Sequence, residues 1–148
     1  MKFLSLLLLA AFVSCAPAYT TSKTNSGEPL AVNGVYIGVF GGAGDLDARV
    51  IAELPRALSG AGFKVTGLKY PDPKGATIKL EGDLTPAQSS EPRPSKFSKA
   101  EIRVIDFRSG AVAAKYRFET GNPLEARGAP ELARDIAGLL SKDFRQLP

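Results

Sequence analysis

The chain contains no histidine and only one cysteine, Cys15. Without histidine there is no imidazole to act as a general base, and a zinc site built from cysteine and histidine is excluded as well. A single cysteine also excludes a disulfide within the chain. The commonest catalytic and metal-binding chemistries are therefore missing, and we expect a protein that is not an enzyme and has no metal or cofactor site.

Long apolar runs and an excess of charge are missing too. The main apolar stretch, which ends just before Cys15, has about ten residues, fewer than the roughly 20 that a membrane-spanning helix requires. Once residues 1–14 are set aside, 18 basic and 15 acidic residues leave a net charge of +3, with the two signs interspersed. So mild a balance predicts no nucleic-acid partner and only a weak preference for anionic partners.

The N-terminal segment has the layout of a secretory signal peptide, with the positive charge of Lys2 before the apolar run. The run ends in Phe12-Val13-Ser14-Cys15, which resembles the bacterial lipobox. The resemblance implies cleavage after residue 14 and a covalent lipid on Cys15. Stable anchoring takes more than one acyl chain, and bacterial lipoproteins of this type usually carry three. The alternative is a plain secretory signal followed by an unmodified cysteine.

Ala16, rather than aspartate, follows the cysteine. By the usual sorting pattern of bacterial lipoproteins, this implies a protein of the outer membrane that faces the periplasm of the cell envelope. The next residues, 16–33, are small and polar, contain two prolines and show no period of 2 or 3.6. We therefore expect three parts: a lipoprotein signal peptide at 1–14, a lipidated cysteine and flexible tether at 15–33, and one globular domain at 34–148.

The first part of this domain has the pattern of strand, helix, strand. Residues 35–40 are a nearly continuous apolar run, which favours a strand in the centre of the sheet. After a glycine-rich turn, Asp45 is placed to cap a helix with one apolar face, and residues 63–66 return to extended structure. The apolar face consists of Leu46, Val50, Ile51, Leu54 and Leu58.

The second half predicts three further strands and a helix. Residues 76–84 alternate between apolar and polar side chains, and residues 85–98, with three prolines and four serines, predict a long mobile loop. A β-hairpin follows at 99–120. Its three-residue loop would pair Ala100 with Phe118, whereas a two-residue loop would pair Phe107 with Val112, and the sequence leaves both registers open.

Pro130 suits the first turn of a last helix over 131–147, which carries an apolar stripe. Together these elements predict an α+β (or α/β) fold. One mixed, mostly antiparallel sheet of about five strands has two helices packed on it, in the order β-α-β-β-β-β-α.

Two groups of residues outside the core are candidates for binding. Three cations surround one aromatic ring in the predicted loop, as a contact patch for an acidic partner or a lipid surface would require; the alternative is a solvated loop. The patch consists of Arg93, Lys96, Phe97 and Lys99. The turn between strand and helix offers amide groups for an anion, but it lacks the Gly-x-Gly-x-x-Gly spacing of a dinucleotide site. This turn consists of Gly41, Gly42, Gly44 and Asp45.

Three segments carry a resemblance at the level of the whole domain: residues 35–40, 58–65 and 102–110. In this order the chain resembles small envelope lipoproteins whose domain is similar to the TolB amino-terminal domain, the curli-secretion lipoprotein and the penicillin-binding-protein activators. The resemblance implies a role in protein contacts within the envelope, without an active site.

Our first hypothesis is thus a non-enzymatic, membrane-anchored accessory or assembly subunit with an envelope protein as partner. The second is a binding module for an anionic envelope component, a peptidoglycan or lipopolysaccharide fragment, which would use the Gly41–Gly44 turn.

Overall fold

A computed structural model describes residues 19–25, 30–66, 76–88 and 92–146 of the chain. The predicted signal peptide and Cys15 lie outside the described residues. The elements are β1 (Tyr19–Asn25), β2 (Ala31–Val32), β3 (Val35–Gly41), α1 (Asp45–Gly60), β4 (Ile78–Pro86), β5 (Lys96–Asp106), β6 (Val112–Thr120), a 3-10 helix (Pro123–Glu125), β7 (Arg127–Gly128), α2 (Ala129–Asp143) and β8 (Arg145–Gln146).

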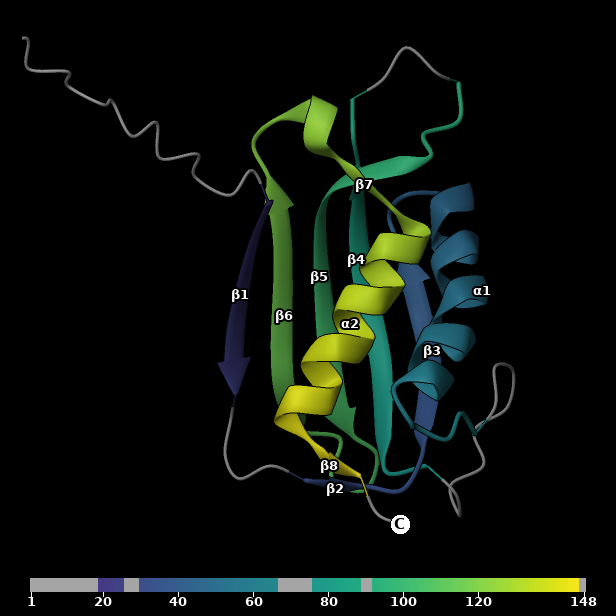
Figure 1. Cartoon of the computed structure of the whole chain (residues 1–148), viewed down its shortest axis with the longest axis vertical. Coiled ribbons are helices and arrows are strands. Elements are labelled where there is room, and N and C mark those ends of the chain that lie inside the picture. Colours follow the sequence, from purple (N-terminus) through teal and green to yellow (C-terminus); the bar gives the residue numbers. More distant parts are fainter. Residues whose placement is uncertain (1–18, 26–29, 67–75, 89–91, 147–148) are drawn as a thin grey trace, which may run out of the picture.

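The main sheet has the strand order β1-β6-β5-β4-β3, and the short β7 pairs with β5. β3 and β4 run parallel, joined through α1, whereas the other neighbours on this path are antiparallel. Both helices lie on the same face of the sheet (Figure 1). The predicted α+β class, with a mixed and mostly antiparallel sheet and two helices, is confirmed.

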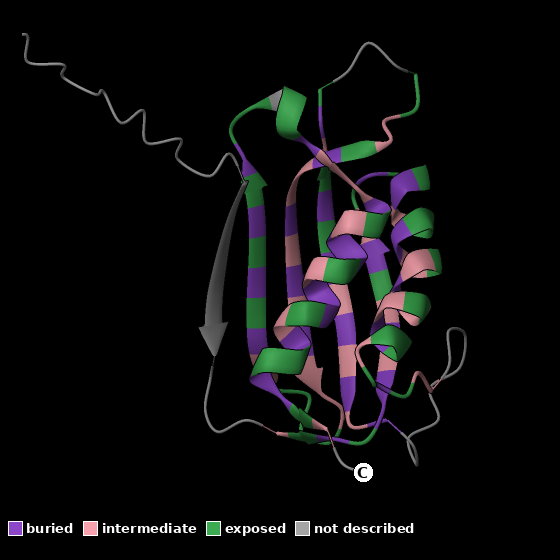
Figure 2. Cartoon of the chain, viewed as in Figure 1, coloured by how far each residue is buried: buried purple, intermediate pink, exposed green. Residues whose placement is uncertain are grey.

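The core lies between this helical layer and the sheet. The predicted face of α1 is buried at Leu46, Val50, Leu54 and Leu58, and α2 contributes residues such as Leu132 and Ile136. Along β4 and β6, buried and more exposed residues alternate, so each strand has one face in the core and one in solvent (Figure 2). This alternation is the period of two that a half-buried strand requires.

The hairpin of β5 and β6 adopts the first of the two registers left open by the sequence. Ala100 lies opposite Phe118, and Ile102 lies opposite Tyr116. Gly110 in the connecting turn has a φ of 72°, a left-handed conformation that glycine adopts without steric cost. The three-residue loop therefore fits the observed turn better than the two-residue alternative.

Three expectations about strands and helix ends are corrected. Residues 63–66 contribute only an isolated parallel bridge between Val35 and Val65, not a strand of the sheet. β3 lies at the edge of the sheet rather than in its centre. Its apolar run serves both faces, because Ile37 points into the core while Tyr36 packs edge-on against Phe107 at a centroid distance of 5.9 Å. The last helix ends at Asp143, since the chain then turns into β8.

The predicted flexible tether is also corrected, because two of its segments form strands. β1 pairs antiparallel with β6 along its whole length, from Tyr19 opposite Thr120 to Asn25 opposite Ala114, and β2 pairs with β8. A strand at the edge of a sheet leaves a row of unpaired backbone groups. β1 satisfies those of β6 through main-chain hydrogen bonds, which need no apolar side chains.

One polar pair links the sheet to the end of α2. The hydroxyl of Tyr116 donates a hydrogen bond of 2.9 Å to the carboxylate of Asp143, and both side chains are buried. Burial, together with this hydrogen bond, raises the pKa of the Tyr116 hydroxyl far above its ordinary value. Tyr116 therefore remains protonated and keeps donating to the carboxylate.

Replacing Tyr116 with phenylalanine should lower the free energy of unfolding by about 1–3 kcal/mol, because the buried Asp143 carboxylate loses the hydrogen bond from this hydroxyl while the packing of the ring is kept. Urea denaturation followed by circular dichroism measures the change. Tyr36→Phe is the matched control: its ring is half-buried and its hydroxyl makes no hydrogen bond to another described residue. Equal stabilities of the two variants would contradict the role given to the Tyr116 hydroxyl.

Candidate functional site: the open face of the sheet

The face of the sheet opposite α1 and α2 is covered by no helix of the described chain (Figure 1). We call it the open face, and define it by the outward charged positions of the three central strands. β4, β5 and β6 each place three charged side chains there because every second residue points away from the core. These residues are Lys79, Glu81, Asp83, Lys99, Glu101, Arg103, Lys115, Arg117 and Glu119.

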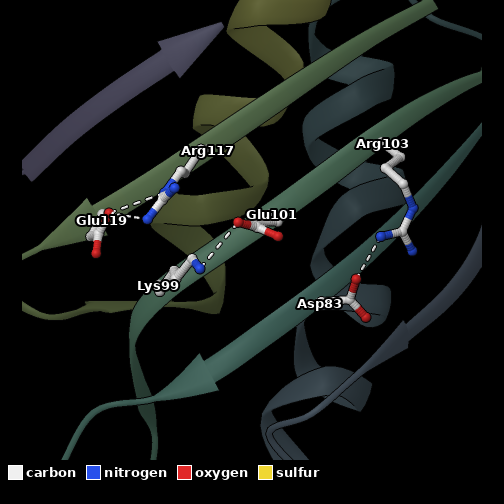
Figure 3. Close-up of polar contacts among 6 residues, drawn as sticks. All are labelled: Asp83, Lys99, Glu101, Arg103, Arg117 and Glu119. Carbon is white, nitrogen blue, oxygen red and sulfur yellow. Dashed lines mark hydrogen bonds and ion pairs between the residues drawn. The ribbon is translucent and has the colours of Figure 1, made fainter. Parts of the chain in front are cut away.

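Most of these charges are paired with a neighbour. Arg103, on the middle strand, binds Asp83 and lies 3.7 Å from Glu81 across the β4–β5 pairing. Figure 3 shows this contact together with two other pairs on the same face, Lys99–Glu101 and Arg117–Glu119. The hydrogen bond to Asp83 raises the pKa of the Arg103 guanidinium further above its ordinary value. The open face thus presents both signs of charge, most of them in ion pairs.

These ion pairs contribute little to stability. Arg117 and Glu119 are about half exposed, at 48% and 47% of their side-chain surface. Exposed pairs are worth about 0–1 kcal/mol each, because water screens them and both side chains lose freedom. The charges of this face are therefore not what holds the fold together.

The predicted contact patch in the 85–98 loop is not formed as expected. β4 continues to Pro86 and β5 begins at Lys96, so the loop between the strands is shorter than predicted. Phe97 is completely buried and lines the core. The alternation of β5 turns its ring towards the helices, because an aromatic side chain gains more from burial than from exposure. The patch therefore lacks its aromatic centre.

The three cations of that patch are separated by the fold. Arg93 is exposed and lies 3.6 Å from Asp45 at the start of α1. Lys96 is exposed at the beginning of β5, and Lys99 pairs with Glu101 on the open face at 3.1 Å. Of these three cations, only Lys99 therefore belongs to the open face.

The Gly41–Gly44 turn already holds a carboxylate of its own chain. The amide of Ala43 donates to both oxygens of Asp47, at 3.2 and 3.3 Å. Gly44, rather than the predicted Asp45, is the N-cap, and Asp45 is the first residue of the helix. The two acidic side chains in the first turn interact favourably with the helix dipole, as an external anion would.

A hollow of about 370 Å³ lies beside α2, between this helix and the end of the sheet near β7. Arg127 donates a hydrogen bond of 2.9 Å to Asp135 within it. Burial raises the pKa of the Asp135 carboxyl, against the opposing effect of Arg127 and Arg134. The lining consists of Phe118, Arg127, Arg134, Asp135, Gly138, Leu139 and Lys142.

Sequence reasoning missed this hollow and most of the open face. The hollow brings Arg127, which precedes α2, together with residues on successive turns of α2. No local sequence motif connects these positions. For the open face a signal existed: polar residues alternate with apolar ones at Lys79 and Glu81, and the hairpin register that pairs Ala100 with Phe118 also places Glu101 opposite Arg117. The charges on neighbouring strands meet only once the register is known.

No helix among the described residues is long and apolar enough to cross a membrane. In the same part of the chain, no three acidic or cysteine side chains come together in a way that would hold a metal ion.

The molecule is thus a small α+β domain with one helical layer and one open sheet face. No protein-family model and no curated protein sequence matches the chain. Among solved structures, PelC from Paraburkholderia phytofirmans, a dodecamer, has a similar fold: the TM-score is 0.57 and the identity 18%, over 86% of this chain and 99% of PelC. A point variant of that dodecamer gives 0.58 and 17%, over 85% and 99%.

A DUF4136 family protein from Bacteroides thetaiotaomicron also has this fold, with a TM-score of 0.51 and 10% identity over 88% of this chain and 99% of that protein. TolB from Acinetobacter baumannii is more distant, with a TM-score of 0.43 and 10% identity over 80% of this chain and 29% of TolB. At these identities the likeness concerns the fold alone. The expected resemblance to small envelope lipoproteins is therefore supported in part, at the level of the fold.

Proposed function

We propose that the protein is a non-enzymatic lipoprotein of the bacterial cell envelope that acts as an assembly subunit. A lipid on Cys15 anchors it to the outer membrane, and its domain faces the periplasm. Copies of the chain associate through the open face of the sheet. The observation that carries this proposal is the set of paired charges on a sheet face that no described helix covers.

Self-association is supported by the composition of the open face. Five basic and four acidic side chains share it, so that a second copy can place acids against bases when the two faces are turned relative to each other. The ion pairs within each copy restrict these side chains before contact, which lowers the ordering cost of association. PelC, whose fold is similar, is a dodecamer.

Reversing one unpaired charge on the open face tests the proposal. Lys115 is exposed and forms no ion pair with another described residue. Lys115→Glu should raise the concentration at half-assembly about tenfold, because like charges are then brought together at every copy of the contact. Mass photometry of the mature protein in detergent measures the distribution of species.

Arg56→Glu is the matched control. It reverses one charge on the exposed side of α1, away from the open face, and Arg56 likewise forms no ion pair with another described residue. This variant should assemble like the unaltered protein. A strictly monomeric protein, or equal effects of the two reversals, would refute assembly through the open face.

A further inference from the structure

β1 changes the length of chain between the lipid and the domain. The strand begins at Tyr19, so that only residues 16–18 separate it from Cys15. Even when fully extended, four residue steps span at most about 14 Å. A lipid on Cys15 would therefore hold the beginning of β1 near the bilayer surface, whereas the predicted 18-residue tether would have let the domain move away from it.

The pairing of β1 decides which end of the domain is held there. Tyr19 lies opposite Thr120, the last residue of β6, so the anchored end is the one where β6 ends and the 3-10 helix follows (Figure 1). β5 begins at the same end, because it runs antiparallel to β6. The turn between β5 and β6 lies at the opposite end, about 30 Å away for a strand of nine residues.

An apolar side chain protrudes at the anchored end. Leu124 in the 3-10 helix is 88% exposed, one of two large hydrophobic residues described as exposed. Its position is fixed by Asn122: the amide of Leu124 donates to the side-chain oxygen of Asn122 at 3.0 Å, and the amide of Glu125 donates to the Asn122 carbonyl at 3.0 Å. The next residue, Ala126, is buried and fastens the turn to the domain.

The charges at this end are mixed. Lys96 is exposed next to β7, and the acidic Glu125 is exposed beside Leu124. A surface of this composition does not select anionic lipids by charge. Instead, an apolar side chain suits the interface between head groups and acyl chains of any bilayer, when it lies at an end of the domain that a short link holds near the lipid anchor.

We propose that the end of the domain formed by the start of β1 and the 3-10 helix docks on the membrane, with Leu124 inserted at the level of the lipid head groups. This inference rests on the proposed function, because it requires the lipid on Cys15. It adds an orientation: the sheet stands upright on the bilayer and its open face is directed sideways, towards neighbouring copies.

Fluorescence quenching in vesicles tests the orientation. Cys15 is the only cysteine of the chain and would be consumed by the lipid, so a new cysteine can be labelled selectively. Leu124→Cys and Arg108→Cys each receive a bimane label in the lipidated full-length protein. Arg108 is the matched control, because it is exposed in the turn at the opposite end. Both proteins are inserted into vesicles of phosphatidylethanolamine and phosphatidylglycerol with brominated acyl chains.

The label at 124 should lose about half or more of its fluorescence, whereas the label at 108 should be unaffected. Bromine on the acyl chains quenches only a label that lies close to it, at the interface of the bilayer. A third protein carries the label at 124 and an insert of about 15 Gly and Ser residues between Ala18 and Tyr19, with an rms reach of about 20–23 Å. Its quenching should fall to the level of the control, although the protein still floats with the vesicles.

Equal quenching at 124 and 108 would overturn the docking, whereas quenching at 124 that the insert does not reduce would support the docking and overturn the role given to the short link. A label at 124 that is shielded from iodide in the Cys15→Ser protein in buffer without detergent or vesicles would also overturn the docking, since that indicates contact with another copy. In each of these cases the lipidated protein still floats with the vesicles, so the lipid anchor stands. A protein that does not float at all would overturn the lipid anchor, and the docking with it.

Discussion

A Cys15→Ser variant should be lost from the membrane fraction and should take up no labelled fatty acid. Serine has no thiolate to form the thioether, and none of the other residues of the chain is a cysteine. Membrane attachment should fall at least about tenfold, since without acyl chains the protein keeps only weak surface contacts. Metabolic labelling of cells with palmitate, followed by their fractionation, measures both effects.

The control for this experiment is Ser14→Ala, which keeps a small residue before the cysteine and should leave labelling and attachment unchanged. The circular dichroism spectrum of Cys15→Ser should match that of the parent, because Cys15 lies before the first strand. A Cys15→Ser protein that remains in the membrane fraction after a high-salt wash would refute the lipid anchor.

The second large effect is expected in the turn between β3 and α1. Gly42 has a φ of 102°, and a Cβ atom at this position would collide with the carbonyl oxygen of Leu84 on the neighbouring strand. Gly42→Ala should lower the free energy of unfolding by about 2–5 kcal/mol, since it combines left-handed backbone strain with a clash against main chain that cannot move aside. Urea denaturation measures this value.

Two neighbouring glycines separate the causes. Gly44 has a φ of 58° but open space around its Cβ position, so Gly44→Ala should cost only the strain, about 1–3 kcal/mol. A Cβ at Gly41 meets nothing within 4 Å, and its φ is not positive, so Gly41→Ala should change stability by less than about 0.5 kcal/mol. Equal losses in the three variants would contradict this explanation.

The sequence predicted the parts of the fold that depend on buried side chains. The spacing of Leu46, Val50 and Leu54 predicted α1 and its buried face, and the pairing of Ala100 with Phe118 was one of the two registers expected for the hairpin. In both cases the period of the apolar residues matches the period of the element. Local patterns were sufficient there.

β1 and Phe97 could not be predicted from the local pattern of apolar residues. β1, with the sequence YTTSKTN, has no apolar alternation, and its place depends on the hydrogen-bonding edge of a strand far along the chain. Phe97 sits among prolines and serines, so the composition of the segment concealed one residue that belongs to the core. The ion pairs between strands of the open face could not be predicted either, because Arg103 meets Asp83 only through the register of β4 and β5.

The pairing of β1 with β6 also sets an order of events during folding. Tyr19 and Thr120 are about 100 residues apart in the chain, so β1 is synthesised long before its partner. Closing so long a loop is entropically costly, and contacts of this kind form late. An enzyme that acts on Cys15 would thus meet a still unpaired segment, and the domain would close against its anchor only after the hairpin has formed.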